Sequence, residues 1–173
     1  MACCIDAELS SCAQTVVDTL RRAGLAVITA ESCTAGLLAA ALSHGTDASE
    51  CLHGGFVVYT KAQKSAALGV DAGILQTQGS VNAEVARQMA EGALRQSRAN
   101  VAVAITGVLG PNPDEDNNPP GVVYMAAARS GEPTEVVRHD FGKREPDVVR
   151  RETVLQALDL LLRTVERGGR ASC

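Results

Sequence analysis

The chain has 173 residues, of which 46 % are hydrophobic, enough for one domain with a sizeable core. Its net charge is −4, aromatic residues make up only 2 % and tryptophan is absent, which argues against nucleic-acid binding through a basic stripe or stacked bases. No apolar run approaches the ~20 residues that span a membrane, and the first residues lack the pattern of a secretory signal. We therefore expect a cytoplasmic protein that binds neither nucleic acid nor membrane.

The six cysteines show no metal-binding or redox spacing. No two of them form a C-x-x-C motif, and two are adjacent near the start of the chain. Free thiols in a reducing compartment are the simplest interpretation. It applies to Cys3, Cys4, Cys12, Cys33, Cys51 and Cys173.

Helices and strands alternate in the first part of the chain. Apolar residues return every three or four positions over 7–23, which predicts an amphipathic helix that a glycine ends. β-branched and small apolar residues predict a strand over 25–30, and an alanine- and leucine-rich run predicts a helix over 33–43. A strand over 53–60 and a short helix over 61–69 follow.

The second part of the chain contains the longest predicted helices and a hairpin. A helix over 82–98 starts with an asparagine, a good cap, and is followed by a continuous apolar run over 101–106, which is typical of a buried strand. Segments 121–128 and 134–141 flank a turn and predict an antiparallel pair of strands. A last helix is predicted over 146–167.

This order of elements predicts the fold class. Helices interleaved with buried strands, plus one hairpin, indicate an α/β protein, a three-layer α/β/α sandwich with a mixed, mostly parallel sheet. Such sheets bind ligands beyond the carboxyl ends of their strands. Three turns are candidates for that edge: Glu31–Gly36, Tyr59–Lys64 and Thr106–Pro111.

Ser32 lies where a predicted strand ends and a helix begins. Unpaired backbone N–H groups and the helix dipole favour negative charge there, so an oxyanion formed by attack of the Ser32 hydroxyl would meet hydrogen-bond donors. The alternative is that Ser32 only caps the helix, which is the commoner role of a serine in that position. The neighbouring Cys33 is a second candidate nucleophile, because a helix start can lower the pKa of a thiol.

Five segments together resemble one protein family. They are TAESCTAG, GGFVVYTKAQKSAALGV, VNAEVARQMAEGAL, AVAITGVLGP and PPGVVYMA. Over about residues 10–165 the chain is similar to the C-terminal domain of the competence/damage-inducible CinA proteins, which also occurs alone as a nicotinamide-nucleotide amidohydrolase. The resemblance implies one such domain over 1–173, without the fused N-terminal domain of full-length members. It also implies deamidation of nicotinamide mononucleotide by a serine/lysine hydrolase, with no metal and no cofactor.

The resemblance implies three catalytic residues: Ser32 as the nucleophile, Lys64 as the general base and Tyr59 as an assisting hydroxyl. An amide carbon is a poor electrophile, so the serine must lose its proton as it attacks. A lysine can accept that proton if burial lowers its pKa from ~10.4 towards ~7–8. Lys61, two positions after Tyr59, competes with Lys64 for the role of base.

The predicted ligand is a small-molecule nucleotide, which needs contacts for an oxyanion and for a phosphate. The backbone N–H groups of Cys33 and Thr34 are candidates for the oxyanion. The phosphate could bind at the predicted helix start, in the loop after the third strand, or to an arginine. Gly-Lys-Arg at 142–144 resembles the family's G-D-R, and 150–151 resembles its paired arginines, so the sequence leaves several candidates. They are Gly36, Thr106, Gly107, Gly110, Arg144, Arg150 and Arg151.

Three departures from the family pattern bear on the substrate. Ala35 stands where many members have glycine, and its methyl group could narrow the approach of a ligand to the backbone. The acidic segment 112–118 replaces a glycine run and would repel a phosphate if it faced the site. Lys61 replaces an asparagine and would lower the pKa of Lys64 further.

These departures leave a second hypothesis open, a non-catalytic paralogue that binds a nucleotide or a protein partner. A competence or DNA-repair accessory acting on nucleic acid is disfavoured by the acidic net charge. Self-association into a homo-oligomer also stays open.

Overall fold

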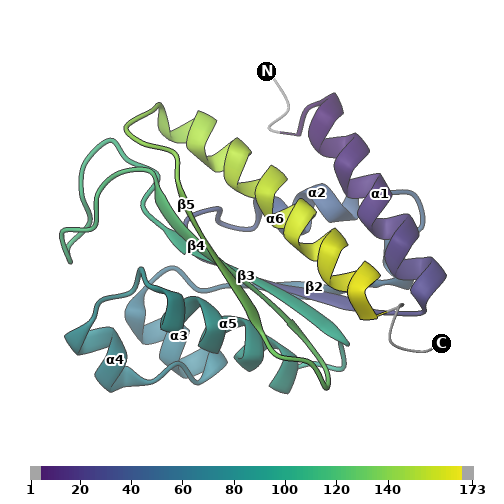
Figure 1. The fold of residues 1–173 in the computed structure, drawn as a ribbon, viewed down its shortest axis with the longest axis horizontal. Coiled ribbons are helices and arrows are strands. Elements are labelled where there is room, and N and C mark those ends of the chain that lie inside the picture. Colours follow the sequence, from purple (N-terminus) through teal and green to yellow (C-terminus); the bar gives the residue numbers. More distant parts are fainter. Residues whose placement is uncertain (1–4, 169–173) are drawn as a thin grey trace.

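The computed structural model describes residues 5–168, and Figure 1 shows their path. The elements in chain order are α1 (Ala7–Ala23), β1 (Val27–Glu31), α2 (Leu37–Ser43), η1 (Ala48–Glu50), β2 (Leu52–Val57), α3 (Lys61–Leu68), α4 (Ala72–Thr77), α5 (Ala83–Arg95), β3 (Val101–Gly107), β4 (Val122–Arg129), β5 (Glu135–Asp140) and α6 (Pro146–Gly168).

The five strands form one sheet in the order β2-β1-β3-β4-β5. Strand β1 pairs in parallel with β2 and β3, whereas β4 pairs antiparallel with both β3 and β5. Four strands therefore run in the same direction and only β4 opposes them. The predicted mixed, mostly parallel sheet and its hairpin are confirmed.

Helices cover both faces of the sheet, which confirms the predicted three layers. Helices α1, α2 and α6 lie on one face and α3, α4 and α5 on the other (Figure 1). Because side chains alternate along a strand, Val103 and Ile105 of β3 belong to the core under α1 and α6. Ala102 and Ala104 belong to the core under α5. A strand buried on both faces needs apolar residues throughout, as this one has.

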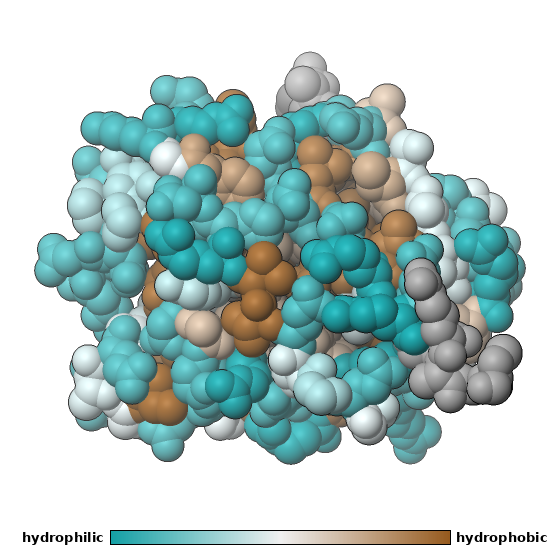
Figure 2. All heavy atoms as spheres, viewed as in Figure 1, coloured by the Kyte–Doolittle hydropathy of each residue, from teal (hydrophilic) through white to brown (hydrophobic). Residues whose placement is uncertain are grey.

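The outer surface is mainly polar. On the face shown in Figure 2, hydrophilic residues predominate, and hydrophobic residues emerge in small separate groups. None of the helices within residues 5–168 is both long and apolar enough to cross a membrane.

Most predicted elements are present, with two corrections. Helix α2 begins at Leu37 rather than at residue 33, because Ala35 and Gly36 adopt left-handed backbone angles, with φ of 51° and 94°. Helix α4 was not expected from the sequence, since its six residues are too few to show helical periodicity. Its start is fixed by the Asp71 side chain, which accepts a hydrogen bond from the N–H of Ile74.

Candidate active site

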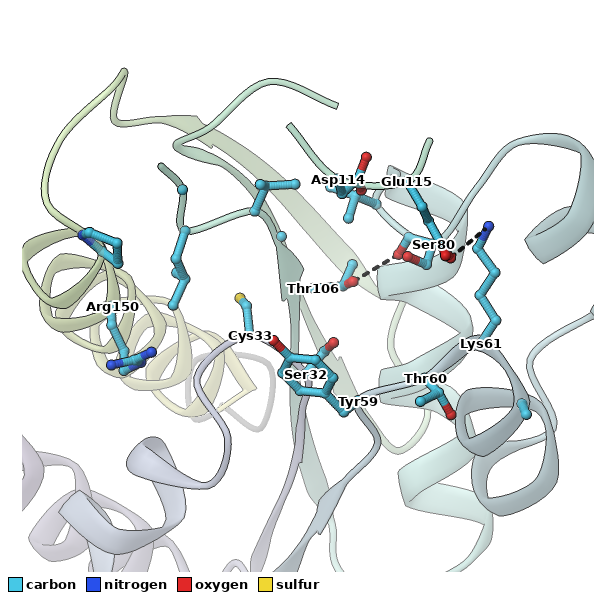
Figure 3. Close-up of a pocket in the computed structure, with 17 residues that line it drawn as sticks. Ser32, Cys33, Tyr59, Thr60, Lys61, Ser80, Thr106, Asp114, Glu115 and Arg150 are labelled. Carbon is cyan, nitrogen blue, oxygen red and sulfur yellow. Dashed lines mark hydrogen bonds and ion pairs between the residues drawn. The ribbon is translucent and has the colours of Figure 1, made fainter. Parts of the chain in front are cut away.

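The three turns predicted at the carboxyl edge of the sheet meet around one cavity of about 580 Å³. Ser32 and Cys33 follow β1, Tyr59 follows β2, and the segment 106–110 ends β3, and all of them line this cavity (Figure 3). The turns converge because β1, β2 and β3 are parallel neighbours, so their carboxyl ends lie at the same edge.

Ser32 and Lys64 are in direct contact. The Lys64 Nζ atom lies 2.9 Å from Ser32 Oγ and donates two further hydrogen bonds, each 3.1 Å long, to the carbonyl oxygens of Val58 and Tyr59. Lys64 is only 1 % exposed, because it shares the inward face of α3 with Leu68, one turn along the helix. The two carbonyls fix Nζ, so the lone pair of the neutral amine would face the Ser32 hydroxyl.

Burial lowers the pKa of Lys64 to about 8, since removing an ammonium from water disfavours its charged form. A Cys33 thiolate would raise it again, but burial raises the pKa of Cys33 to about 12, so that group is a neutral thiol in this range. Of the remaining neighbours, Glu115 raises the pKa of Lys64 and Lys61 lowers it. The effect of Lys61 has the expected sign and is the smallest of these causes.

The buried carboxylate of Glu31 organises the turn that carries Ser32. It is fully buried and accepts hydrogen bonds from the hydroxyl of Thr34 (2.7 Å) and from the N–H groups of Leu38 (3.0 Å) and Ala39 (2.9 Å). The N–H of Gly36 is a further donor to it, at 3.1 Å. Thr34 and Gly36 therefore support the turn and do not line the cavity. One signal of this role is visible in the sequence, a carboxylate at the end of an apolar strand.

The role of Glu31 corrects two expectations about the helix start. Ser32 does not cap α2, because the cap position is Gly36 and Glu31 supplies the acceptors. The α2 start is also no phosphate site, since a carboxylate already occupies it. Within residues 5–168, the N–H groups of Cys33 and Thr34 donate to no main-chain or side-chain oxygen, and of the two residues Cys33 lines the cavity.

The end of β3 forms the opposite wall. The Thr106 hydroxyl is buried and donates to the carbonyl of Ser80 (2.8 Å), so Thr106 braces the wall. Gly107 has no space for a side chain, because a Cβ there would lie 2.8 Å from the Val122 carbonyl oxygen. Leu109 and Gly110 line the cavity, and among the described residues their N–H groups have no acceptor.

Of the three candidate arginines, only Arg150 lines the cavity. It contacts Asp147 at 2.6 Å, but that carboxylate is 91 % exposed, so the pair is weak. Arg151 points to α1 instead, where it contacts Asp6 (2.6 Å). Arg144 is exposed on the loop before α6 and is not part of the cavity wall.

The acidic segment lies over the same cavity. Asp114 and Glu115 line it, and Lys61 forms ion pairs with Asp116 (2.6 Å) and Glu115 (3.2 Å). Hydrogen bonding to Asp116 is the main cause that raises the pKa of Lys61. Lys61 is therefore a charged partner of the acidic segment. Unlike Lys64, it makes no contact with Ser32. Ala35 is exposed and is not a lining residue, so its methyl group does not narrow the cavity.

The sequence profile of the CinA C-terminal domain matches residues 9–165 of this chain. The chain belongs to the CinA C-terminal domain family. A CinA-like protein of Mycolicibacterium vanbaalenii is 40 % identical over 147 residues, which cover 85 % of this chain and 35 % of the relative. A CinA-like protein of Gloeobacter violaceus is 37 % identical over 94 % of this chain and 38 % of the relative. The chain thus spans about a third of the length of the curated relatives it matches.

Solved structures of the family share the fold along nearly the whole chain. The competence/damage inducible protein CihA from Agrobacterium tumefaciens is 36 % identical with a TM-score of 0.89, over 96 % of this chain and 99 % of that one. A CinA superfamily protein from Escherichia coli is 33 % identical with a TM-score of 0.85, over 89 % of this chain and 88 % of that one.

Two further features of this CinA C-terminal domain bear on its chemistry. Among residues 5–168, no group of three or more His, Cys, Asp or Glu side chains is placed to hold a metal ion. Cys12, Cys33 and Cys51 carry free thiols. Cys3, Cys4 and Cys173 lie outside the described residues.

Proposed function

We propose that this CinA C-terminal domain is an amidohydrolase that converts nicotinamide mononucleotide, or a related carboxamide, to the acid and ammonia. The observation that carries the proposal is the contact of 2.9 Å between the Ser32 hydroxyl and Lys64, whose pKa burial lowers to about 8. Most lysines are solvated and charged, whereas a buried lysine against a serine hydroxyl is suited to accept its proton.

The first half of the reaction forms an acyl-enzyme. As the Ser32 Oγ atom bonds to the carboxamide carbon, its proton passes to the neutral Nζ of Lys64, and the carbonyl oxygen becomes an oxyanion. The free N–H group of Cys33, which lines the cavity, would hold that oxyanion, and one such donor is typically worth about 3–4 kcal/mol. When the intermediate collapses, the C–N bond breaks, the Lys64 ammonium protonates the leaving nitrogen, and ammonia departs.

The second half releases the acid. Water attacks the Ser32 ester while Lys64 accepts one proton from the water. The ester bond to Oγ then breaks, and Lys64 returns that proton to the serine. The product is the carboxylic acid, which loses its remaining proton to solvent, and the enzyme regains its starting state. Each step uses the same contact between Oγ and Nζ, so a single base serves both halves.

The remaining lining residues supply binding. Arg150 and the free N–H groups of Leu109 and Gly110 are the groups we assign to the phosphate, because guanidinium and amide donors match its oxygens. The Tyr59 side chain is 68 % exposed and borders the cavity, while only its carbonyl contacts Lys64. We assign its hydroxyl to the substrate.

Ammonia release from nicotinamide mononucleotide tests the proposal. The unaltered chain and a Ser130→Ala control, which removes an exposed hydroxyl in the turn between β4 and β5, should release ammonia equally. Ser32→Ala should lose about a thousandfold or more in kcat, because no other group replaces the nucleophile. Full activity in Ser32→Ala would reject the serine mechanism, and activity lost only in Cys33→Ala would assign the thiol.

A second candidate function is binding without turnover. It is favoured by Asp114 and Glu115, which place negative charge in a cavity proposed to hold a phosphate ester. Calorimetric binding of nicotinamide mononucleotide by the unaltered chain, with no ammonia released, would support this alternative.

A further inference from the structure

Among the charged side chains that line the cavity, Arg150 stands apart from Asp114, Glu115 and Lys61. Figure 3 shows Arg150, from α6, on one side and Asp114 and Glu115 on the other, with Ser32 and Tyr59 between them. A ligand whose reacting carbonyl lies at Ser32 therefore has a guanidinium on one side and, on the other, two carboxylates together with the Lys61 ammonium that pairs with Glu115.

The carboxylate side is held in place by specific contacts. Asp116 accepts hydrogen bonds from Lys61 Nζ (2.6 Å) and from the N–H of Ser80 (3.1 Å). Asp114 accepts from the N–H of Asp116 (3.0 Å). Gly79 leaves room for this packing, since a Cβ there would lie 2.5 Å from an Asp116 carboxylate oxygen. These contacts hold the acidic segment as one wall of the cavity, where Lys61 pairs with Glu115 and Asp116 and, within residues 5–168, no ammonium pairs with Asp114.

We propose that Glu115, assisted by Asp114, is a specificity determinant that selects carboxamides carried on a cationic ring, such as an N-alkylated pyridinium, over neutral-ring analogues. This inference rests on the proposed function and names the substrate class of that site. A ligand with a cationic ring and one anionic group would align with the cavity, its anion toward Arg150 and its ring toward the acidic wall. Charge separation of this kind discriminates between ligands of the same shape.

The Lys64 ammonium, which contacts the lining residue Ser32, is affected by the acidic wall through Glu115. Glu115 raises the pKa of Lys64 by more than Lys61 lowers it, although Lys61 forms an ion pair with that same carboxylate. Glu115 therefore favours the charged form of Lys64, next to Ser32, although burial dominates and lowers the pKa of Lys64.

The test compares nicotinamide mononucleotide with benzamide riboside 5′-monophosphate, in which a carbon atom replaces the charged ring nitrogen. Dissociation constants are measured by calorimetry on the Ser32→Ala protein, so that neither ligand is consumed, and kcat/KM is measured on the active protein. We expect the cationic ligand to bind about three- to thirtyfold more tightly. Coulomb's law gives this range for two unit charges ~8 Å apart when the effective dielectric constant varies from that of water to that of a protein surface. The preference should shrink as salt is added.

Glu115→Gln is the decisive variant, because Asp116 still holds Lys61 and Ser80 when it is made. It should reduce the preference for the cationic ring at least threefold, in binding and in kcat/KM alike. The matched control is Glu166→Gln, which removes one exposed carboxylate of α6 outside the cavity and should leave the preference unchanged.

The outcomes separate this inference from the proposed function. If ammonia is released but the Glu115→Gln and Glu166→Gln proteins show the same ligand preference as the unaltered chain, the inference is wrong and the amidohydrolase stands. Equal affinity of the unaltered chain for the two ligands would likewise reject the inference and leave the amidohydrolase proposal standing. If neither ligand binds and no ammonia is released, the proposed function fails and the inference fails with it.

Discussion

The pH dependence of kcat/KM reports the ionisation of Lys64 in the free enzyme. With a pKa of about 8, Lys64 carries the free amine in about one molecule in eleven at pH 7 and in about one in two at pH 8. If only the free amine accepts the Ser32 proton, kcat/KM rises about fivefold from pH 7 to pH 8 and by about twofold or less from pH 8 to pH 9. An ordinary lysine with a pKa of ~10.4 would give about tenfold for each of these steps.

The assay is ammonia release from dilute nicotinamide mononucleotide at constant ionic strength. The phosphate of the substrate keeps its charge over pH 7–9, because the second pKa of a phosphate ester is ~6. The substrate phosphate therefore adds no inflection to the profile in this range. Lys61→Ala is the matched control and should keep the inflection, because Lys61 is the smallest of the causes that set the Lys64 pKa. A kcat/KM that does not change between pH 7 and pH 9 would show that the ionisation of Lys64 does not control the reaction. An inflection that disappears in Lys61→Ala and persists in Lys64→Ala would transfer the role of base to Lys61.

Three further predictions concern stability and the remaining site residues. Because the folded-state pKa of Lys64 is lowered from 10.5 to about 8, the unfolded chain binds more protons between these values. The free energy of unfolding should therefore rise by about 3 kcal/mol across that pH range, and urea titrations should show this rise missing from Lys64→Met. Ala35→Gly should raise the melting temperature by about 1–3 °C without changing KM, because it relieves a positive φ of 51° at an exposed site; a lower melting temperature would contradict this. Tyr59→Phe should lower kcat/KM several-fold and leave the pH inflection in place, since the hydroxyl does not contact Lys64; a displaced inflection would instead support a proton relay.

The regular elements and the three turns at the sheet edge could be predicted from the sequence because their signals are local. Apolar periodicity defines α1 and α5, and a continuous apolar run defines β3. Elements shorter than two helical turns leave no such signal, which is why α4 was missed and α2 was expected four residues too early. The left-handed turn at Ala35 was also hidden, since alanine ordinarily favours a helix.

The residue types that follow the parallel strands, Ser32 directly after β1 and Lys64 in the helix after β2, can be identified from the sequence alone. Which of these residues meet depends on the packing of the whole chain. The contact of Ser32 with Lys64 spans 32 residues, and that of Lys61 with Asp116 spans 55. Such contacts depend on strand order and on the inward turn of α3, which no local pattern encodes. The same holds for the low pKa of Lys64, because burial is a property of the packed molecule.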